Sequence, residues 1–351
     1  MSSTRRGYLK IVAGAAAGLA AGGAAGYLLK PTPTTEQVEK KYAFTFAGWS
    51  PGSDPWATAL AAGINNIRKI LPDCTISYIY PEPETMEQYV TTIDTALNSG
   101  IDGIFIGVWY PEATKPMYTK AKQLGIPVVS YNIPCPDDWN PGASGDPRNL
   151  DQGFVGVRIP DCTAALINRA LADFTPGHSV YCTHGAGRAW DSVQYGGMSA
   201  AMEAAGLPKP DYLEIGGPEG SDTTQAYEDM RAYIQANPTT DLLLTVGPLG
   251  AHPAIQLVKD LGKKGVIRIA DDGGMDDVLM TAIHDEYVIC GVDQQTFFQA
   301  FIPPMWLYCM LEFGFFPPRF TQTGPAVIDK NNLESIRLQV EKAGYLPPEW
   351  E

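Results

Sequence analysis

Residues 125–132 read Gly-Ile-Pro-Val-Val-Ser-Tyr-Asn, a short apolar run that follows a glycine and ends in an amide. β-Branched and aromatic residues in such a run favour a strand, and its nearly continuous apolar character indicates burial on both faces. Asn132 stands where the strand ends. Its side chain carries donors and an acceptor, which suits a ligand hydroxyl group. An Asx turn is the structural alternative at this position.

Similar runs recur along the chain and alternate with longer stretches of helical period. We expect one set of strands at 43–48, 75–80, 101–108 and 126–131, and a second set at 178–183, 211–215, 241–246, 265–270 and 288–292. This alternation is typical of βαβ units. The sequence therefore predicts an α/β fold with two Rossmann-like parallel-sheet domains. The Pro- and Gly-rich segment 134–152 is expected to be the loop at their junction.

Polar or glycine-rich loops follow several of these strands. In open parallel sheets ligands bind beyond the carboxyl ends of the strands, so two such domains would direct their loops into a shared cleft. Asp54-Pro55-Trp56 opens the first helix there. An indole face can stack on the C–H face of a sugar while a carboxylate accepts its hydroxyl hydrogens. Helix capping and core packing are the alternatives for Asp54 and Trp56.

Further tryptophans stand just beyond strands or at helix starts. Trp109, Trp190 and, with weaker support, Trp49 could each add a stacking face, and for Trp190 the alternative is a helix-start residue packed on the sheet. In the second half, Asp271-Asp272 and Asp293-Gln294 follow predicted strands and supply acids and an amide to the same cleft.

The composition excludes several classes of function. The chain has 351 residues with 25 Lys+Arg against 39 Asp+Glu, a net charge of −14 and a pI near 4.7. Such a surface cannot exchange counterions with a nucleic-acid backbone. The four histidines form no His-Glu-x-x-His spacing and there is no Gly-x-Ser-x-Gly elbow. We predict no catalytic residue, metal ligand or cofactor.

The N-terminus indicates export. Residues 4–10 read Thr-Arg-Arg-Gly-Tyr-Leu-Lys and precede the Ala- and Gly-rich run 11–29, which resembles a twin-arginine export signal. Residues 1–30 are therefore expected to be a signal or, if uncleaved, a membrane anchor through 11–29, and 31–41 an extended spacer. The protein is expected in the periplasm or at the outer face of the cell membrane.

An exported chain can form disulfides. The chain has six cysteines: Cys74, Cys135, Cys162, Cys182, Cys290 and Cys309. Sequence does not fix their pairing, although Cys135 and Cys162 bracket a loop and form the candidate disulfide. Buried free thiols are the alternative for Cys182, Cys290 and Cys309.

From Tyr42 to Leu346 the chain resembles the sugar-binding family of periplasmic binding proteins, the type I fold of ribose- and galactose-binding proteins that serve ABC importers. The motifs that carry the resemblance are Asp54-Pro55-Trp56, Gly125–Val129 followed by Asn132, Asp272-Gly273, and Val292-Asp293-Gln294-Gln295 before an aromatic helix. The resemblance implies that a monosaccharide contacts Asp54, Trp56, Asn132, Asp272 and Gln294.

Two departures from the family pattern affect the expected ligand. Gln194 stands where many relatives carry an arginine, and Gly247-Pro248 stands where they carry Asn-Asp. The cleft is thus expected to lack one cationic group and one amide. Together with the aromatic faces, this favours a neutral monosaccharide or polyol over a phosphate or carboxylate ligand.

The resemblance also implies three crossings between the domains, which form a hinge. One lobe would hold 42–133 and 294–323, and the other 153–293 and 324–351. The implied protein is a monomeric carrier that delivers its sugar to an ABC transporter permease. A sensory receptor module of the same fold is the main alternative, and a secreted enzyme is a weaker one.

Overall fold

A computed structural model of the chain describes residues 40–52, 55–217 and 220–344. The expected export signal or anchor, most of the spacer, Asp54 and the last seven residues lie outside this part. Within it, no helix is long and apolar enough to cross a membrane.

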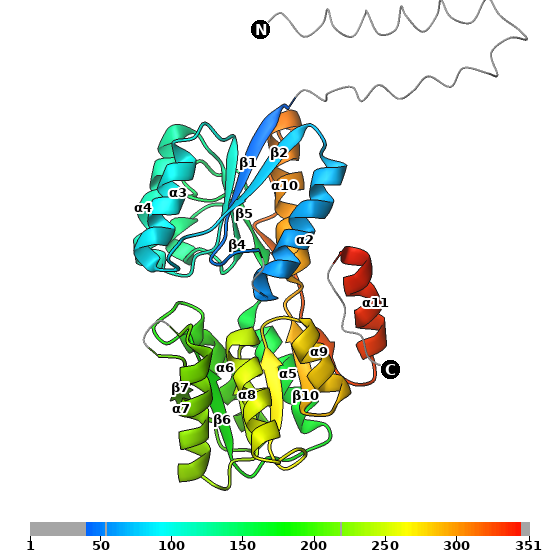
Figure 1. The fold of residues 1–351 in the computed structure, drawn as a ribbon. Helices are drawn as coiled ribbons and strands as arrows, with labels where there is room; N and C mark the ends of the chain where they lie inside the picture. Colours follow the sequence, from blue (N-terminus) through cyan, green and yellow to red (C-terminus); the bar gives the residue numbers. More distant parts are fainter. Residues whose placement is uncertain (1–39, 53–54, 218–219, 345–351) are drawn as a thin grey trace, which may run out of the picture. The chain divides into compact units, whose positions relative to one another are not determined.

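The chain forms two six-stranded sheets, which confirms the predicted α/β fold (Figure 1). The first sheet has the order β11-β5-β4-β3-β1-β2 and all of its strands are parallel. Its strands are β1 (Tyr42–Ala47), β2 (Cys74–Ile79), β3 (Gly103–Ile106), β4 (Val128–Asn132), β5 (Gly153–Gly156) and β11 (Phe320–Gln322).

The second sheet has the order β12-β10-β9-β8-β6-β7, and only its edge strand β12 is antiparallel. Its strands are β6 (Ser179–Thr183), β7 (Asp211–Glu214), β8 (Leu242–Thr245), β9 (Arg268–Asp272), β10 (Val288–Asp293) and β12 (Ala326–Ile328). The central strands β6 and β8 are buried along their whole length, as expected for strands covered on both faces.

Helices cover both faces of each sheet. In Figure 1, α3 (Met86–Leu97) and α4 (Pro111–Leu124) lie on one face of the first sheet, while α2 (Pro55–Ile70) packs with α10 (Thr296–Phe313) on the other. In the second, α5 packs with α6, and α8 with both α7 and α9. These helices are α5 (Ile159–Leu171), α6 (Asp191–Ala204), α7 (Thr223–Ala236), α8 (Gly247–Asp260) and α9 (Asp277–His284), and α11 (Leu333–Ala343) follows β12.

Strand β5 corrects the expected domain boundary. It pairs with β4 and β11, so residues 153–156 belong to the first sheet rather than to the second lobe. The segment 134–152 therefore is not the junction. It includes the single-turn helix η1 (Asp137–Trp139) and packs against α4, where the centre of the Trp139 ring lies 5.3 Å from that of the Tyr118 ring.

The chain passes between the sheets three times, after β5, after β10 and after β11. Each passage follows the end of a strand. Gln294 begins the passage after β10, and Asn132, which ends β4, lies within hydrogen-bond distance of it.

All six cysteines are free thiols, so the proposed Cys135–Cys162 disulfide is wrong. The two thiols have different surroundings. The Cys135 Sγ lies 3.1 Å from the Ser130 Oγ. Cys162 is buried on α5, where burial and, to a lesser extent, the charges of Asp272, Asp161 and Asp293 raise the pKa of its thiol.

Close contact between α2 and α10 requires a glycine. A Cβ at Gly63 would lie 2.4 Å from the Phe297 carbonyl oxygen and 3.0 Å from the Ala300 Cβ. The two helices would have to move apart to accept a side chain.

We predict that Gly63→Ala lowers the free energy of unfolding by about 1–3 kcal/mol, because the added methyl group overpacks this contact. Gly196→Ala is the matched control, since a Cβ at this exposed site on α6 meets nothing within 4 Å. It is expected to be neutral or to stabilise by up to about 1 kcal/mol. Thermal unfolding of both variants checks this, and a Gly63→Ala protein as stable as Gly196→Ala would contradict the packing argument.

Candidate functional site

A cavity of about 150 Å³ lies beyond the carboxyl ends of strands from both sheets. This is on the order of ten times the minimum space for one water, ~10–15 Å³, so the cavity can hold a small organic molecule. Its lining is mostly aromatic and aliphatic, with a few polar groups. The lining residues are Trp49, Ser50, Trp56, Glu84, Trp109, Tyr110, Asn132, Ile133, Val157, Ile159, His184, Arg188, Trp190, Gln194, Ser221, Val246, Gly247, Pro248, Leu249, Gly273 and Gln294.

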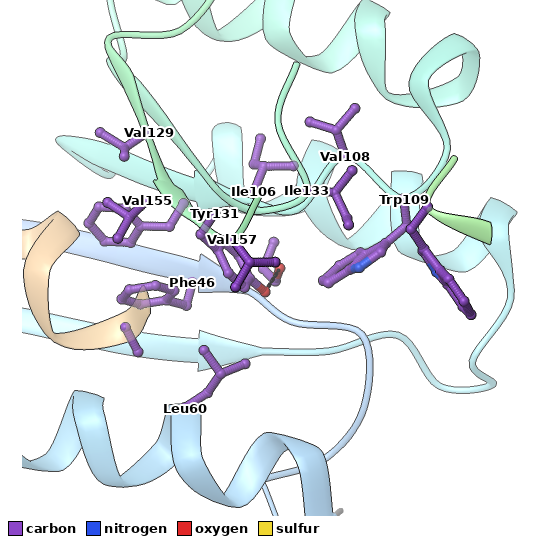
Figure 2. Packing of buried hydrophobic residues seen from close by; sticks show 14 of the residues in the cluster. Phe46, Leu60, Ile106, Val108, Trp109, Val129, Tyr131, Ile133, Val155 and Val157 are labelled. Carbon is purple, nitrogen blue, oxygen red and sulfur yellow. Dashed lines mark hydrogen bonds between the residues drawn. The ribbon is translucent and has the colours of Figure 1, made fainter. Parts of the chain in front are cut away.

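The aromatic wall is built around Trp109. Its ring packs edge-on against Trp56 at 6.2 Å, Trp49 at 6.0 Å and Tyr131 at 5.8 Å. Figure 2 shows Trp109 beside Val108 and Ile133, beyond the strand residues of the core. Edge-to-face packing holds these rings in fixed orientations. The wall therefore offers rigid apolar faces without rearrangement.

Asn132 and Gln294 meet at the polar edge of the cavity, although 162 residues separate them. The Asn132 Nδ2 donates to the Gln294 Oε1 at 3.0 Å. Asn132 has a φ of 60°, a left-handed conformation that asparagine tolerates better than most residues. The end of β4 is thus turned so that its last side chain reaches the crossover after β10.

Asp272 lies behind this lining. It is 1% exposed, and its Oδ2 accepts a hydrogen bond from the Gln194 Nε2 at 2.8 Å, while its Oδ1 has no partner among the described residues. Burial, together with the charge of Asp271, raises the pKa of Asp272 to about 7, and hydrogen bonding from Gln194 and Gln294 offsets part of this rise. Asp272 therefore acts on the cavity through the two glutamines.

The neighbouring Asp271 points away from Asp272, as alternate residues of a strand do. Its Oδ1 accepts from the Thr245 Oγ1 at 2.7 Å and its Oδ2 has no described partner. Burial raises the pKa of Asp271 to about 7 as well. Two adjacent buried carboxyls are costly to ionise together.

Sequence reasoning missed His184 and Arg188. Burial and the nearby Arg188 lower the pKa of His184 to about 4, so its ring is neutral at pH 7. Its Nε2 donates to the Val246 carbonyl oxygen at 2.9 Å, which leaves the Nδ1 as an acceptor with no described partner. Of the segment between β6 and α6, the sequence singled out only Trp190.

Arg188 is a cationic lining residue that the sequence did not identify, and it lies elsewhere than Gln194, where the relatives' arginine is missing. It lines the cavity with its guanidinium carbon 5.3 Å from the centre of the Trp49 ring. Glu84 lines the same cavity, so the lining carries both signs of charge. No sequence motif distinguished either residue from other surface charges.

Of the residues selected from sequence, six line one cavity, Asp272 lies behind it and Asp54 lies outside the described part. The six are Trp56, Trp109, Asn132, Trp190, Gln194 and Gln294. Trp49 also lines it. Whether each one contacts a ligand stays a prediction.

In the described part of the chain, no three His, Cys, Asp or Glu residues gather to hold a metal. Outside the cavity lining, His252 lies 2.7 Å from the Asp276 Oδ2, and Asp276 also caps α9 by accepting from the Leu279 backbone N–H. Helix capping therefore explains the acidic residues Asp276 and Asp277 at the start of α9.

The buried carboxyls predict a pH-dependent stability. An unfolded Asp ionises near pH ~4, so between pH 6.5 and 8 the folded protein loses protons that the unfolded chain has already lost. The free energy of unfolding therefore falls as pH rises. The pKa of His252 is raised, so this residue also makes the free energy of unfolding fall as pH rises. The lowered pKa of His184 has the opposite effect, but only below pH ~6.5, where the histidine of the unfolded chain gains a proton.

Between pH 6.5 and 8, we expect the free energy of unfolding of Asp272→Asn to fall by about 1 kcal/mol less than that of the wild type, because an amide does not ionise. Glu112→Gln, at an exposed site, is the control and should leave the pH profile of the wild type unchanged. Melting temperature measured against pH checks this. Parallel profiles for wild type and Asp272→Asn would show that Asp272 does not titrate in this range.

Comparison with known proteins finds related chains. The chain is 24% identical over 276 residues to a xylose/arabinose-binding protein, XylF, from Sulfolobus acidocaldarius, covering 77% of this chain and 67% of that protein. A carbohydrate transporter from Acidothermus cellulolyticus, solved with myo-inositol, has a TM-score of 0.71 at 20% identity over 86% of this chain and 98% of its own. An ABC transporter solute-binding protein from Burkholderia graminis, solved with D-arabinose, has a TM-score of 0.70 at 17% identity over 84% and 98%.

The family model described as a periplasmic binding protein domain matches residues 45–314, which is most of the chain. The two six-stranded sheets agree with the type I fold that the sequence motifs indicated. The chain therefore belongs to the periplasmic binding protein family and has its type I fold.

Proposed function

We propose that this protein binds a neutral monosaccharide or polyol outside the cytoplasm and delivers it to an ABC importer. The observation that carries the proposal is the cavity itself, in which tryptophan rings and side-chain amides line one space, with the Asp272 carboxyl bonded to Gln194 behind it. A sugar has apolar C–H faces and hydroxyl edges that match these two kinds of wall. The relatives named for xylose/arabinose, myo-inositol and D-arabinose support the same class of ligand.

The charges of the lining support a neutral ligand. Arg188 and Glu84 offset one another, and the lowered pKa of His184 keeps its ring uncharged. Phosphate recognition usually needs several cations or a bidentate arginine. Arg188 is the only Arg or Lys among the described lining residues.

In this proposal each selected residue has a role. Trp56, Trp109 and Trp190 supply stacking faces, Asn132, Gln194 and Gln294 bond the hydroxyl groups, and Asp272 holds the glutamines. Asp54, two residues before Trp56, is proposed as a further acceptor from its position in the sequence. No catalytic role is proposed for any of them.

Transport also requires a conformational signal. We propose that the three crossovers act as a hinge between a lobe of 42–156 with 294–323 and a lobe of 157–293 with 324–351, and that the importer's permease recognises the closed form. The export motif at residues 4–10 is consistent with a monomeric carrier in the periplasm or at the outer face of the membrane.

Thermal melting of the protein with D-xylose, L-arabinose, D-arabinose, D-galactose and myo-inositol tests the ligand class. A sugar present at 1,000 times its dissociation constant adds about 4 kcal/mol to the free energy of unfolding, so the melting temperature should rise by roughly 8 °C or more. Glucuronate and glucose 6-phosphate are the charged controls. A rise with these two alone would contradict a neutral ligand, and a flat profile throughout would contradict a sugar.

We predict that Trp56→Ala and Asp272→Ala each weaken binding of the sugar that gives the largest shift by at least about 1.5 kcal/mol, more than tenfold. The first removes a stacking face, and the second leaves Gln194 without its acceptor. Trp306→Ala on α10 is the matched control, since Trp306 is half-buried and does not line the cavity. Calorimetric affinities unchanged in both cavity variants would show that the ligand binds elsewhere.

A further inference from the structure

Gln299 lies in the first turn of α10, is fully buried and does not line the cavity. Its side chain nevertheless makes hydrogen bonds to three other residues. The Nε2 donates to the Gln294 carbonyl oxygen and to the Thr323 Oγ1, both at 3.1 Å, and the Oε1 accepts from the Asn132 Nδ2 at 3.1 Å. One buried amide thus connects the end of β4 to the crossovers after β10 and β11.

The direction of these bonds is fixed by a backbone group. A carbonyl oxygen can only accept a hydrogen bond, so the Gln299 amide must turn its Nε2 toward Gln294. The Thr323 hydroxyl donates its own hydrogen to the same carbonyl at 2.9 Å, so its oxygen is left to accept from Gln299. With the Nε2 placed, the Oε1 must face Asn132.

Asn132 is oriented in turn. Its Nδ2 carries two hydrogens, and both are used inside the protein, one by the Gln299 Oε1 and one by the Gln294 Oε1 at 3.0 Å. The Oδ1 has no partner within the described residues, although Asn132 lines the cavity. Asn132 therefore offers a ligand an acceptor and no donor, which corrects the expectation that its amide would offer both.

We propose that Gln299 is a positioning residue that sets the hydrogen-bonding specificity of the cavity, by holding Asn132 with its Oδ1 toward the ligand. The proposal rests on the proposed function and deepens it: the ligand must present an O–H or N–H hydrogen at this place. The Asp272 Oδ1 and His184 Nδ1, which are buried close to the lining, also have no partner among the described residues. A sugar whose hydroxyl at this position is replaced by fluorine or a methyl ether would be rejected.

The backbone at both ends of the network is held in uncommon conformations. Asn132 and Gln295 have φ values of 60° and 54°, and the Gln295 side chain accepts from the Gly324 backbone N–H at 2.8 Å. Left-handed non-glycine residues gathered at one place are typical of functional sites, because the surrounding contacts must offset their cost. Here they lie where the chain leaves the sheets, beside the proposed ligand contacts.

Two substitutions separate a positioning role from a merely structural one. Gln299→Met keeps the length of the side chain and offers Asn132 no strong acceptor, so Asn132 can turn. Gln299→Glu keeps an acceptor toward Asn132 but buries a carboxyl opposite the Gln294 carbonyl, which destabilises the fold. We expect Glu to be the less stable variant and Met to be the weaker binder. If Gln299 had a structural role alone, the less stable of the two variants would also be the weaker binder.

The orientation of Asn132 is tested first without any sugar. In ¹⁵N-labelled protein, its side-chain amide is assigned by comparison with Asn132→Ala. We expect both hydrogens to exchange at least about 100-fold more slowly than those of the exposed Asn65. One hydrogen should lose this protection in Gln299→Met and neither in Gln299→Glu. Exchange as fast as at Asn65 in the wild type, or unchanged protection in Gln299→Met, would overturn the proposal.

Calorimetry with D-xylose, L-arabinose and myo-inositol then tests specificity. For any of them that binds the wild type, Gln299→Met should lower the affinity at least about tenfold and Gln299→Glu less than about threefold. Tyr118→Phe, which removes a buried hydroxyl bonded to the Ile106 carbonyl oxygen and Ser130, is the control and should bind as the wild type does. Equal losses in the two Gln299 variants would overturn the proposal. If the wild type binds none of these sugars but its Asn132 hydrogens are protected from exchange, the proposed function is contradicted, while the orientation of Asn132 is established.

Discussion

Polar side chains at the buried ends of parallel strands are the constraint on which the rest of this structure depends. The strands of both sheets end beside one cavity, and water is largely excluded from those ends. A buried polar atom without a partner costs about 1–3 kcal/mol. Asn132 and Gln194 satisfy this requirement through other side chains, but the Asp272 Oδ1 and His184 Nδ1 do not. The folded protein therefore carries the cost of these two unpartnered atoms.

Rigidity of the aromatic wall complements these unfilled acceptors. Tyr131, which packs against Trp109, is fully buried and donates its hydroxyl hydrogen to the Ala47 carbonyl oxygen at 2.9 Å. Tyr89 packs against Trp109 from another side and bonds the Gly107 carbonyl oxygen at 3.0 Å. Because these tyrosines are tied to the backbone of the first sheet, the tryptophan faces need little ordering when a ligand arrives, and less binding free energy is lost.

The sequence patterns predicted nine of the twelve strands in the described part of the chain, and most of these are apolar runs with a clear end. They missed β5, β11 and β12, which are short and lie beside Gly or Pro, so that no period can be recognised. Trp56, Asn132 and Gln194 could be selected because each closely follows the end of a predicted strand or begins the next helix. His184 and Arg188 could not, since what distinguishes them is the neutral ring and the guanidinium held over Trp49, and both depend on burial and tertiary contact.

Hydrogen-bond direction is the property that sequence could least supply. An asparagine at a strand end offers donors and an acceptor in principle, and nothing near Asn132 in the chain selects among them. The selection comes from Gln299, 167 residues later, and ultimately from the Gln294 carbonyl oxygen that fixes the Gln299 amide. Because a carbonyl oxygen cannot donate, this orientation does not depend on pH or on ligand, unlike one set by a titrating group such as Asp272. The cavity therefore has a fixed acceptor, the Asn132 Oδ1, close to a carboxyl, Asp272, whose protonation changes with pH. It can distinguish ligands by the positions of their O–H and N–H hydrogens as well as by their shape.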